Sequence, residues 1–220
     1  MTFLNVYVNI YAHEKVISED KKTMPSHDMI LSMMEKNNGY VAASSLRDLG
    51  IDTKILQRMA ARGEIERLAH GLYMSADRME DPYFVAMYRC PQGVYSMNSA
   101  LFLHQLTDRN PYQLCMTIPS GTNTALLKDR GFCFYYLAKE QWALGRMSIM
   151  TPFGNPVSVY DLERTLVDCV RKIDVLDRDE VLSAIKSYAR RKVRDQSKLL
   201  SYAEVFRVRK QVWQYLEVLS

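Results

Sequence analysis

The spacing of the hydrophobic positions changes several times along the chain, and these changes predict the order of its elements. Over residues 26–37, apolar side chains recur every three to four positions, which is typical of a helix with one buried face. Asn38-Gly39 ends this helix, and residues 40–41 can form one short strand. A second short helix follows over residues 44–49, and Gly50 supplies the positive φ that a tight turn between two helices requires.

A third amphipathic helix is predicted over residues 53–62, and two strands follow it. Asp52 is a residue type that commonly caps a helix N-terminus. Residues 64–68 and 71–74 are predicted to be strands joined in a small β-hairpin. Helix, short strand, helix, turn, helix and hairpin is the order of a winged helix-turn-helix. We therefore predict such a domain over residues 24–78, and we expect it to fold around its own small core.

Residues 79–220 alternate strand-like and helical segments and become helical toward the end. Strands are predicted at 114–118, 132–137, 147–150 and 156–159, and helices at 82–88, 97–106, from 161 onward, 179–192, 196–206 and 207–219. Ser96 and Asp161 are expected to cap the helices that follow them. The chain is thus predicted to be α+β, with an N-terminal winged helix-turn-helix and a mixed α+β C-terminal domain. Residues 1–23 form a separate leader, to which the pattern assigns no role.

Charge is distributed unevenly, although the net charge is only +4. Residues 1–78 contain ten basic and ten acidic side chains, whereas residues 186–210 contain nine basic and two acidic ones. A local surplus of this size is typical of a surface that binds a polyanion, and a solvated helix face is the alternative. The candidate nucleic-acid or antitoxicity face consists of Lys186, Arg190, Arg191, Lys192, Arg194 and Lys198.

The third predicted helix carries the candidate DNA-binding side chains. Its outward face contains hydrogen-bonding groups of a length suited to base edges in the major groove. The hairpin adds an arginine and a histidine placed for phosphate or minor-groove contact. An ordinary amphipathic helix with a solvated polar face is the alternative here as well. The predicted contact residues are Thr53, Lys54, Gln57, Arg58, Arg62, Arg67 and His70.

Signatures of catalysis and of cofactor or metal binding are missing from the sequence. It contains no C-x-x-C pair, P-loop or G-x-G-x-x-G, and its four cysteines are expected to be reduced and buried. Asp161 and Glu163 follow a predicted strand like the acidic pair of some nucleases, but the lysine that would activate water is missing and Arg164 stands in line instead. We expect no enzyme activity, cofactor or metal. Since no apolar run reaches the ~18 residues of a membrane span and no signal peptide is evident, a cytoplasmic location is expected.

Several segments of the chain resemble the AbiEi family of antitoxins. Residues 39–51, together with Gly63-Glu64-Ile65-Glu66-Arg67 and Gly71-Leu72-Tyr73, are similar to the winged helix of that family. Residues 96–107 resemble its S-x-x-S-A-L-x-x-H-x-L-T segment, and residues 159–168 resemble its D-x-E-[RK]-T-L-x-D helix. The order and spacing of these segments cover nearly the whole chain apart from the leader.

The resemblance implies the antitoxin of a type IV toxin–antitoxin system. Its winged helix would repress its own operon by binding double-stranded DNA at inverted repeats in the promoter. Its C-terminal domain would counter a nucleotidyltransferase-like toxin without forming a stable complex. Matching the basic face of the family points to Lys54, Arg58, Arg62, Arg67 and the segment 186–198. Two alternatives stay open: an antitoxin or adaptor that binds its partner directly through the C-terminal domain, and a nucleic-acid-processing enzyme that uses Asp161 and Glu163.

Overall fold

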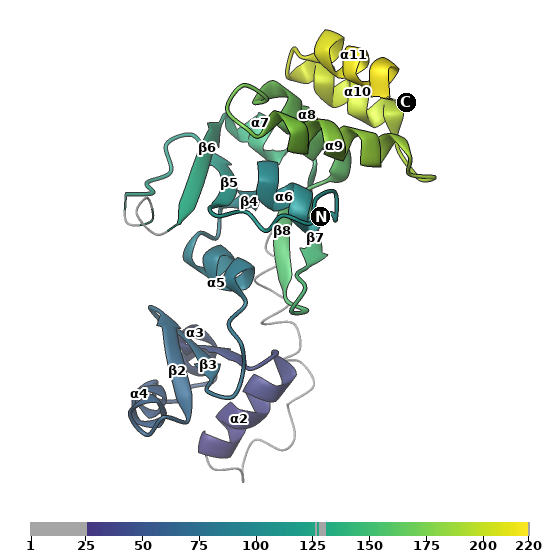
Figure 1. Cartoon of the computed structure of the whole chain (residues 1–220). Coiled ribbons are helices and arrows are strands. Elements are labelled where there is room, and N and C mark those ends of the chain that lie inside the picture. Colours follow the sequence, from purple (N-terminus) through teal and green to yellow (C-terminus); the bar gives the residue numbers. More distant parts are fainter. Residues whose placement is uncertain (1–25, 126, 128–130, 220) are drawn as a thin grey trace. The chain divides into compact units, whose positions relative to one another are not determined.

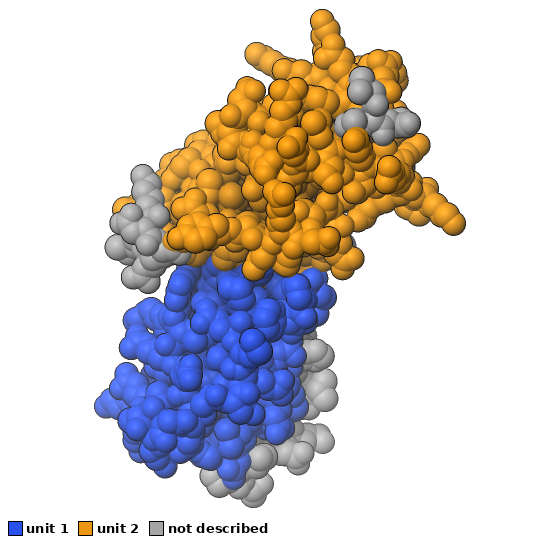
Figure 2. All heavy atoms as spheres, in the orientation of Figure 1, with its two compact units in different colours: residues 1–90, 150–156 blue, residues 91–149, 157–220 orange. Residues whose placement is uncertain are grey.

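The structure is a computed structural model that describes residues 26–125, 127 and 131–219, so the predicted leader, residues 1–23, lies outside it (Figure 1). The described chain is mixed α+β, as the sequence pattern predicts. It forms two compact units, which Figure 2 colours separately. Unit 1 extends to Cys90 and also includes residues 150–156, whereas unit 2 comprises residues 91–149 and the chain from Val157 onward.

Unit 1 alternates short helices and strands. Its elements are α2 (Ser26–Lys36), β1 (Tyr40–Ala42), α3 (Ala43–Asp48), α4 (Lys54–Ala61), β2 (Ile65–Ala69), β3 (Leu72–Ser75) and α5 (Pro82–Arg89). The strands pair antiparallel in the order β1-β3-β2, so that β2 and β3 form a hairpin. Asp52 accepts a hydrogen bond on Oδ1 from the Lys54 N–H at 3.0 Å, which satisfies a backbone donor at the start of α4.

Two apolar clusters stabilise unit 1. The first joins α2, α3 and α4 to the sheet and contains Ile30, Met34, Val41, Leu46, Leu56, Met59, Ile65 and Tyr73. The second joins the sheet to α5 and contains Tyr40, Leu72, Met74, Phe84 and Val85. Removing these side chains from water is the main term that favours the fold, at about 25 cal/mol per Å² of apolar surface.

Unit 1 extends beyond the boundary that the pattern predicts at residue 78. Helix α5 contributes Phe84 and Val85 to the second apolar cluster, and the Arg89 guanidinium donates to the Leu68 carbonyl oxygen at 2.6 Å. The sequence pattern separated α5 from this unit because a polar turn precedes it. A fragment of residues 24–78 keeps the first cluster but lacks Phe84 and Val85, two of the five buried residues of the second. The unit that the structure shows therefore includes α5, and the folding of the shorter fragment stays a prediction.

The buried carboxylate of Asp81 connects α5 to the distant segment 150–156. Its Oδ1 atom caps α5 by accepting the N–H groups of Tyr83 and Phe84 at 3.0 and 3.1 Å. Its Oδ2 atom accepts hydrogen bonds from Thr151 Oγ1 at 2.6 Å and from Asn155 Nδ2 at 2.8 Å. Both carboxylate oxygens are therefore satisfied inside the protein, as a buried polar group requires.

Unit 2 is built on a mixed sheet with helices that follow it in the chain. Its elements are β4 (Val94–Tyr95), α6 (Met97–Leu103), β5 (Leu114–Pro119), β6 (Phe132–Leu137), α7 (Lys139–Ala143), β7 (Arg146–Met150), β8 (Pro156–Tyr160), α8 (Leu162–Arg171), α9 (Arg178–Ala189), α10 (Gln196–Val205) and α11 (Arg209–Leu219). The strand order is β6-β5-β4-β8-β7. Strand β4 runs antiparallel to β5 and parallel to β8, and β5 runs parallel to β6.

A single apolar cluster joins α6, β5 and helices α8 to α11. These last four helices lie together in Figure 1, where they are coloured from green to yellow. The apolar side chains of Leu166, Cys169 and Val170 on α8 all belong to the cluster. In the part of the chain that the structure describes, no helix is long and apolar enough to cross a membrane.

The structure differs from the predictions for unit 2 at β4, at α7, at Ser96 and at the end of α6. Strand β4 and helix α7 were not predicted, because two and five residues are too short to show a period. Ser96 precedes α6 without capping it, since its hydroxyl accepts a hydrogen bond from Thr117 Oγ1 at 2.9 Å instead. Helix α6 ends at Leu103, earlier than predicted, and Gln105 just beyond it has a left-handed φ of 56°.

Candidate nucleic-acid interface

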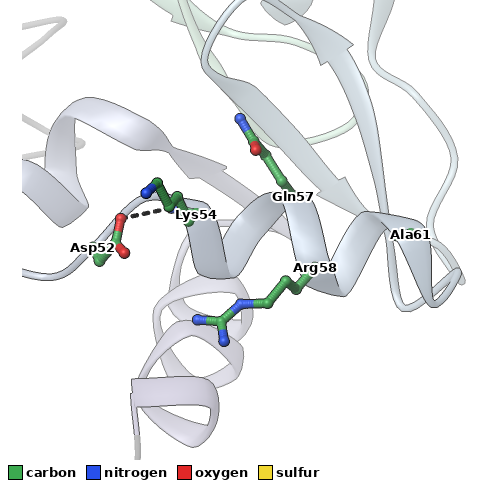
Figure 3. Close-up of a pocket in the computed structure, with 5 residues that line it drawn as sticks. All are labelled: Asp52, Lys54, Gln57, Arg58 and Ala61. Atoms are coloured by element: carbon green, nitrogen blue, oxygen red, sulfur yellow. Dashed lines mark hydrogen bonds between the residues drawn. The ribbon is translucent and has the colours of Figure 1, made fainter.

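The polar side of α4 lies on the surface of unit 1. Leu56 and Met59 direct the opposite side of the helix into the first apolar cluster, which fixes its rotation about its own axis. Gln57 and Arg58 are exposed and extend from adjacent positions in different directions, as Figure 3 shows, whereas Thr53 is half-buried. An open hollow on this face is lined by Asp52, Lys54, Gln57, Arg58 and Ala61.

The side chains that line this hollow can form hydrogen bonds with a polar ligand. Arg58 presents a fork of donors, and Gln57 offers both a donor and an acceptor. Ala61, one turn further along the helix, adds only a methyl group to the lining. The Asp52 carboxylate is occupied by the Lys54 backbone N–H, so the hollow combines two cationic side chains with one engaged carboxylate.

Arg62 and His27 share one carboxylate. Arg62 Nε lies 2.9 Å from Glu64 Oε1, and His27 Nε2 lies 2.7 Å from Glu64 Oε2. The hydrogen bond with Glu64, followed by the one with Asp28, raises the pKa of His27 above its usual value. Arg62 is exposed, as the sequence predicts, and Glu64 occupies its Nε donor, which leaves the Nη1 and Nη2 donors for a phosphate.

The β2–β3 hairpin brings its two predicted contact residues together. Arg67 Nη2 lies 3.4 Å from His70 Nδ1, and both side chains are exposed. Helix α5 contacts the turn of the hairpin, where the Tyr88 hydroxyl donates to the Gly71 carbonyl oxygen at 3.2 Å. Gly71 has a φ of +77°, and a Cβ there would lie 3.4 Å from the Tyr88 hydroxyl, so a glycine fits this position best.

The basic segment of unit 2 divides into an exposed group and a structural group. The structural group consists of Arg191, which donates through Nη2 to the His104 carbonyl oxygen at 2.8 Å, and Lys198, which lies 3.0 Å from Asp161 Oδ2. Lys198 is thus neutralised by a partner, contrary to its expected place on a free basic face. The exposed group makes no ion pair within the described ranges and consists of Lys186, Arg190, Lys192 and Arg194.

A lysine lies beside the acidic pair of unit 2, although none follows the pair in the sequence motif. Lys198, on α10, lies 3.0 Å from Asp161 and 3.8 Å from Glu163. The Tyr202 hydroxyl donates to Asp161 at 2.8 Å, and the Tyr188 hydroxyl donates to Glu163 at 3.3 Å. These carboxylates therefore hold α8 against α9 and α10. No group of three or more metal-ligating side chains is arranged for a metal ion in the described part of the chain.

The arginine that follows this acidic pair is entirely buried. Arg164 Nε lies 3.0 Å from Asp168 Oδ2, and Nη1 donates to the carbonyl oxygens of Gln141 and Leu144, both at 2.9 Å. Its guanidinium carbon lies 4.0 Å from the centre of the Phe206 ring. The D-x-E-R-T-L-x-D segment consequently contributes to the interior of unit 2, where its charges are paired with protein groups.

Comparison with known proteins gives a likeness in fold. No protein-family model and no curated protein matches the chain. Among solved structures, the crystal structure of the RV2827C protein from Mycobacterium tuberculosis is similar, with a TM-score of 0.59 and 13% sequence identity. The alignment covers 90% of this chain and 77% of that chain. The chain therefore shares a mixed α+β fold with the RV2827C protein.

Proposed function

We propose that this protein is a DNA-binding antitoxin that represses its own operon and counters a nucleotidyltransferase-like toxin. In this proposal the elements α2 to β3 form a winged helix-turn-helix, with α4 as the recognition helix and the β2–β3 hairpin as the wing. The observation that carries the proposal is the exposed face of α4, where Gln57 and Arg58 border an open hollow while the opposite face is fixed in the core. The proposal gives the protein no catalytic step and places it in the cytoplasm.

Sequence recognition would depend on α4, and orientation would depend on the hairpin. A guanidinium can bind the O6 and N7 atoms of guanine together, and a glutamine amide can bind adenine in the same manner. We assign Arg58 and Gln57 to these contacts because both are exposed and Arg58 makes no ion pair among the described residues. Lys54, Arg67 and His70 would contact phosphates, which position a protein on DNA without reading its sequence.

The antitoxin activity is assigned to unit 2 on the strength of the sequence resemblance. Its exposed basic group, defined above, is the surface suited to a polyanion such as the nucleic acid on which a nucleotidyltransferase-like toxin could act. If both proteins act on the same nucleic acid, the antitoxin can counter the toxin without binding it. We therefore expect no stable complex between the two.

DNA binding is tested with the full chain and a labelled duplex from the region upstream of its own gene. The expected result is binding about 10³-fold or more tighter than to a random duplex of equal length and salt concentration. Footprinting should then locate the protected bases in inverted repeats. Equal affinity for the two duplexes would contradict the repressor proposal.

The antitoxin role is tested by co-expression with the product of the neighbouring reading frame, which this proposal expects to be a nucleotidyltransferase-like toxin. The expected result is restored growth, with no complex recovered when either protein is purified through a tag. Recovery of a stable complex would favour the direct-binding alternative, in which unit 2 is the docking domain. Failure to restore growth would contradict both forms of the antitoxin proposal.

A further inference from the structure

Two cysteines of unit 2 lie directly opposite each other in the sheet. Cys115 on β5 is the register partner of Cys133 on β6, and the two strands are parallel. Directly paired residues of a parallel ladder point to the same face, and neighbouring strands lie about 4.8 Å apart. This spacing lies within the range of Cα separations that a disulfide bond spans, about 4.4–6.8 Å. The strand register therefore allows the two sulfur atoms to be joined with little backbone movement.

The two thiols differ in their access to solvent. Cys115 is buried on the inner strand β5, whereas Cys133 is half-buried on β6, the edge strand of the sheet. Cys133 therefore departs from the prediction that all four cysteines are buried. Cys90 and Cys169 are both buried, with 4% and 0% of their surface exposed. A small oxidant that approaches from solvent would thus reach Cys133 first.

We propose that Cys115 and Cys133 form an oxidisable dithiol, in which Cys133 reacts with a peroxide and Cys115 converts the product into a disulfide. The Cys133 thiolate attacks one oxygen of hydrogen peroxide, so that an S–O bond forms, the O–O bond breaks and hydroxide leaves to become water on protonation. The Cys115 sulfur then attacks the Cys133 sulfenic acid; an S–S bond forms, the S–O bond breaks and a second water leaves. Two thiols lose two electrons, and one peroxide gains them.

The electrostatics of the pair support this order of attack. A hydrogen bond with the Cys115 thiol, aided by one from the Tyr135 hydroxyl, lowers the pKa of Cys133. The same hydrogen bond, together with burial, raises the pKa of Cys115, which retains its proton. The Cys115 Sγ atom also lies 3.8 Å from the Gln113 carbonyl oxygen, a long contact that competes weakly for that proton. Cys133 is thus the nucleophile, and Cys115 is the resolving thiol.

The test treats the folded full-length protein with hydrogen peroxide and measures its intact mass without reductant. The expected product lacks two hydrogen atoms, regains them with dithiothreitol and yields one cross-linked peptide pair that contains Cys115 and Cys133. Cys90→Ala serves as the matched control and should form the same cross-link. In Cys115→Ser the disulfide cannot form, and dimedone should instead label the sulfenic acid at Cys133.

Several outcomes would overturn the proposal. These are the absence of an intramolecular disulfide, a disulfide that involves Cys90 or Cys169, and a cross-link that forms only after unfolding in urea. Peptide mapping of the wild-type protein gives the answer even if Cys115→Ser does not fold. Because the readout is covalent mass, it does not depend on DNA binding or on antitoxin activity.

Discussion

Arg164 and Asp168 form an ion pair one turn apart on α8, and both side chains are fully buried. Burial raises the pKa of Asp168, while the neighbouring guanidinium groups of Arg164 and Arg171 oppose that shift. The Asp168 charge therefore depends on its arginine partners. We expect Arg164→Met to lower the free energy of unfolding by about 3–5 kcal/mol, because it leaves a buried carboxylate with less compensation. Urea denaturation followed by circular dichroism measures this loss.

An exposed ion pair of the same unit provides the matched control. Arg109 Nη1 lies 2.8 Å from Asp177 Oδ2, but 70% of the Arg109 side chain is exposed. Arg109→Ala should therefore cost less than about 1 kcal/mol. Equal losses of unfolding free energy in the two variants would mean that burial does not make the Arg164 ion pair more important for stability.

Arg58→Ala should weaken binding to the upstream duplex by about 1–3 kcal/mol while leaving affinity for random DNA nearly unchanged, since Arg58 is assigned to a base edge. Fluorescence anisotropy with both duplexes measures the two losses. Arg178→Ala removes the same charge from an exposed position in unit 2 and is the control. If Arg58→Ala weakens binding to both duplexes equally, Arg58 contacts a phosphate instead of a base.

Arg67→Ala should weaken binding to all DNA sequences by a similar factor. One phosphate contact fewer should also reduce the slope of log affinity against log salt concentration by about 0.9. A salt titration from low to moderate ionic strength gives this slope for the wild type and the variant. An unchanged slope would exclude the hairpin arginine from the DNA interface.

The His27–Glu64 contact should make stability depend on pH. The pKa of His27 is raised above its usual 6.5, so the folded state holds the proton more tightly than the unfolded state does. The stabilisation is fully present below pH 6.5 and is lost as the pH rises through the folded pKa. Burial lowers the pKa of His104, which contributes with the opposite sign.

The measurement is accordingly the difference between wild type and His27→Gln in melting temperature across this pH range. The melting temperature of the wild type should exceed that of the variant at acidic pH, and this difference should shrink at alkaline pH. A difference that grows with pH would show that the neutral imidazole is the stabilising form.

Changing the exposed basic group of unit 2 to glutamate should weaken DNA binding without destabilising the fold. The quadruple variant alters Lys186, Arg190, Lys192 and Arg194 and takes the 186–210 segment from +7 to −1. These side chains are exposed, so the melting temperature should change little. Arg191 and Lys198 are left intact because they bond to other parts of unit 2. Affinity for DNA should fall sharply at low salt and less at high salt, since salt screens the lost attraction.

The growth assay with the toxin shows which activity this group serves. If the quadruple variant binds the upstream duplex normally but no longer restores growth, the group acts in antitoxicity alone. If both activities persist, the group is a solvated surface, which is the alternative that the charge pattern left open.

Local patterns along the sequence predicted much of unit 1. The spacing of Ile30 and Met34 predicted α2, and that of Leu56 and Met59 predicted α4, because one turn of helix brings such residues to one face. The cap at Asp161 was also predicted, and its side chain accepts the Arg164 backbone N–H three residues ahead. The exposure of Gln57 and Arg58 follows from the same period.

The remaining features depend on contacts between residues far apart in sequence. The hydrophobic pattern contains no register between β5 and β6, so the pairing of Cys115 with Cys133 could not be predicted. Similarly, Lys198 reaches Asp161 only because α10 packs on α8. Charge counting treated Lys198 as free because it compares neighbours along the chain and ignores neighbours in space.

The bonds of Asp81 to Thr151 and Asn155 affect how the protein folds as the ribosome makes it. Asp81 precedes these partners by 70 and 74 residues. At about 5–20 residues per second, roughly 4–15 s pass between the synthesis of Asp81 and that of Asn155. During this interval the nascent unit 1 has α5 but not the groups that satisfy Asp81 Oδ2, so water must solvate that oxygen. The N-terminal unit can reach its final form only after more than half of the chain has been translated.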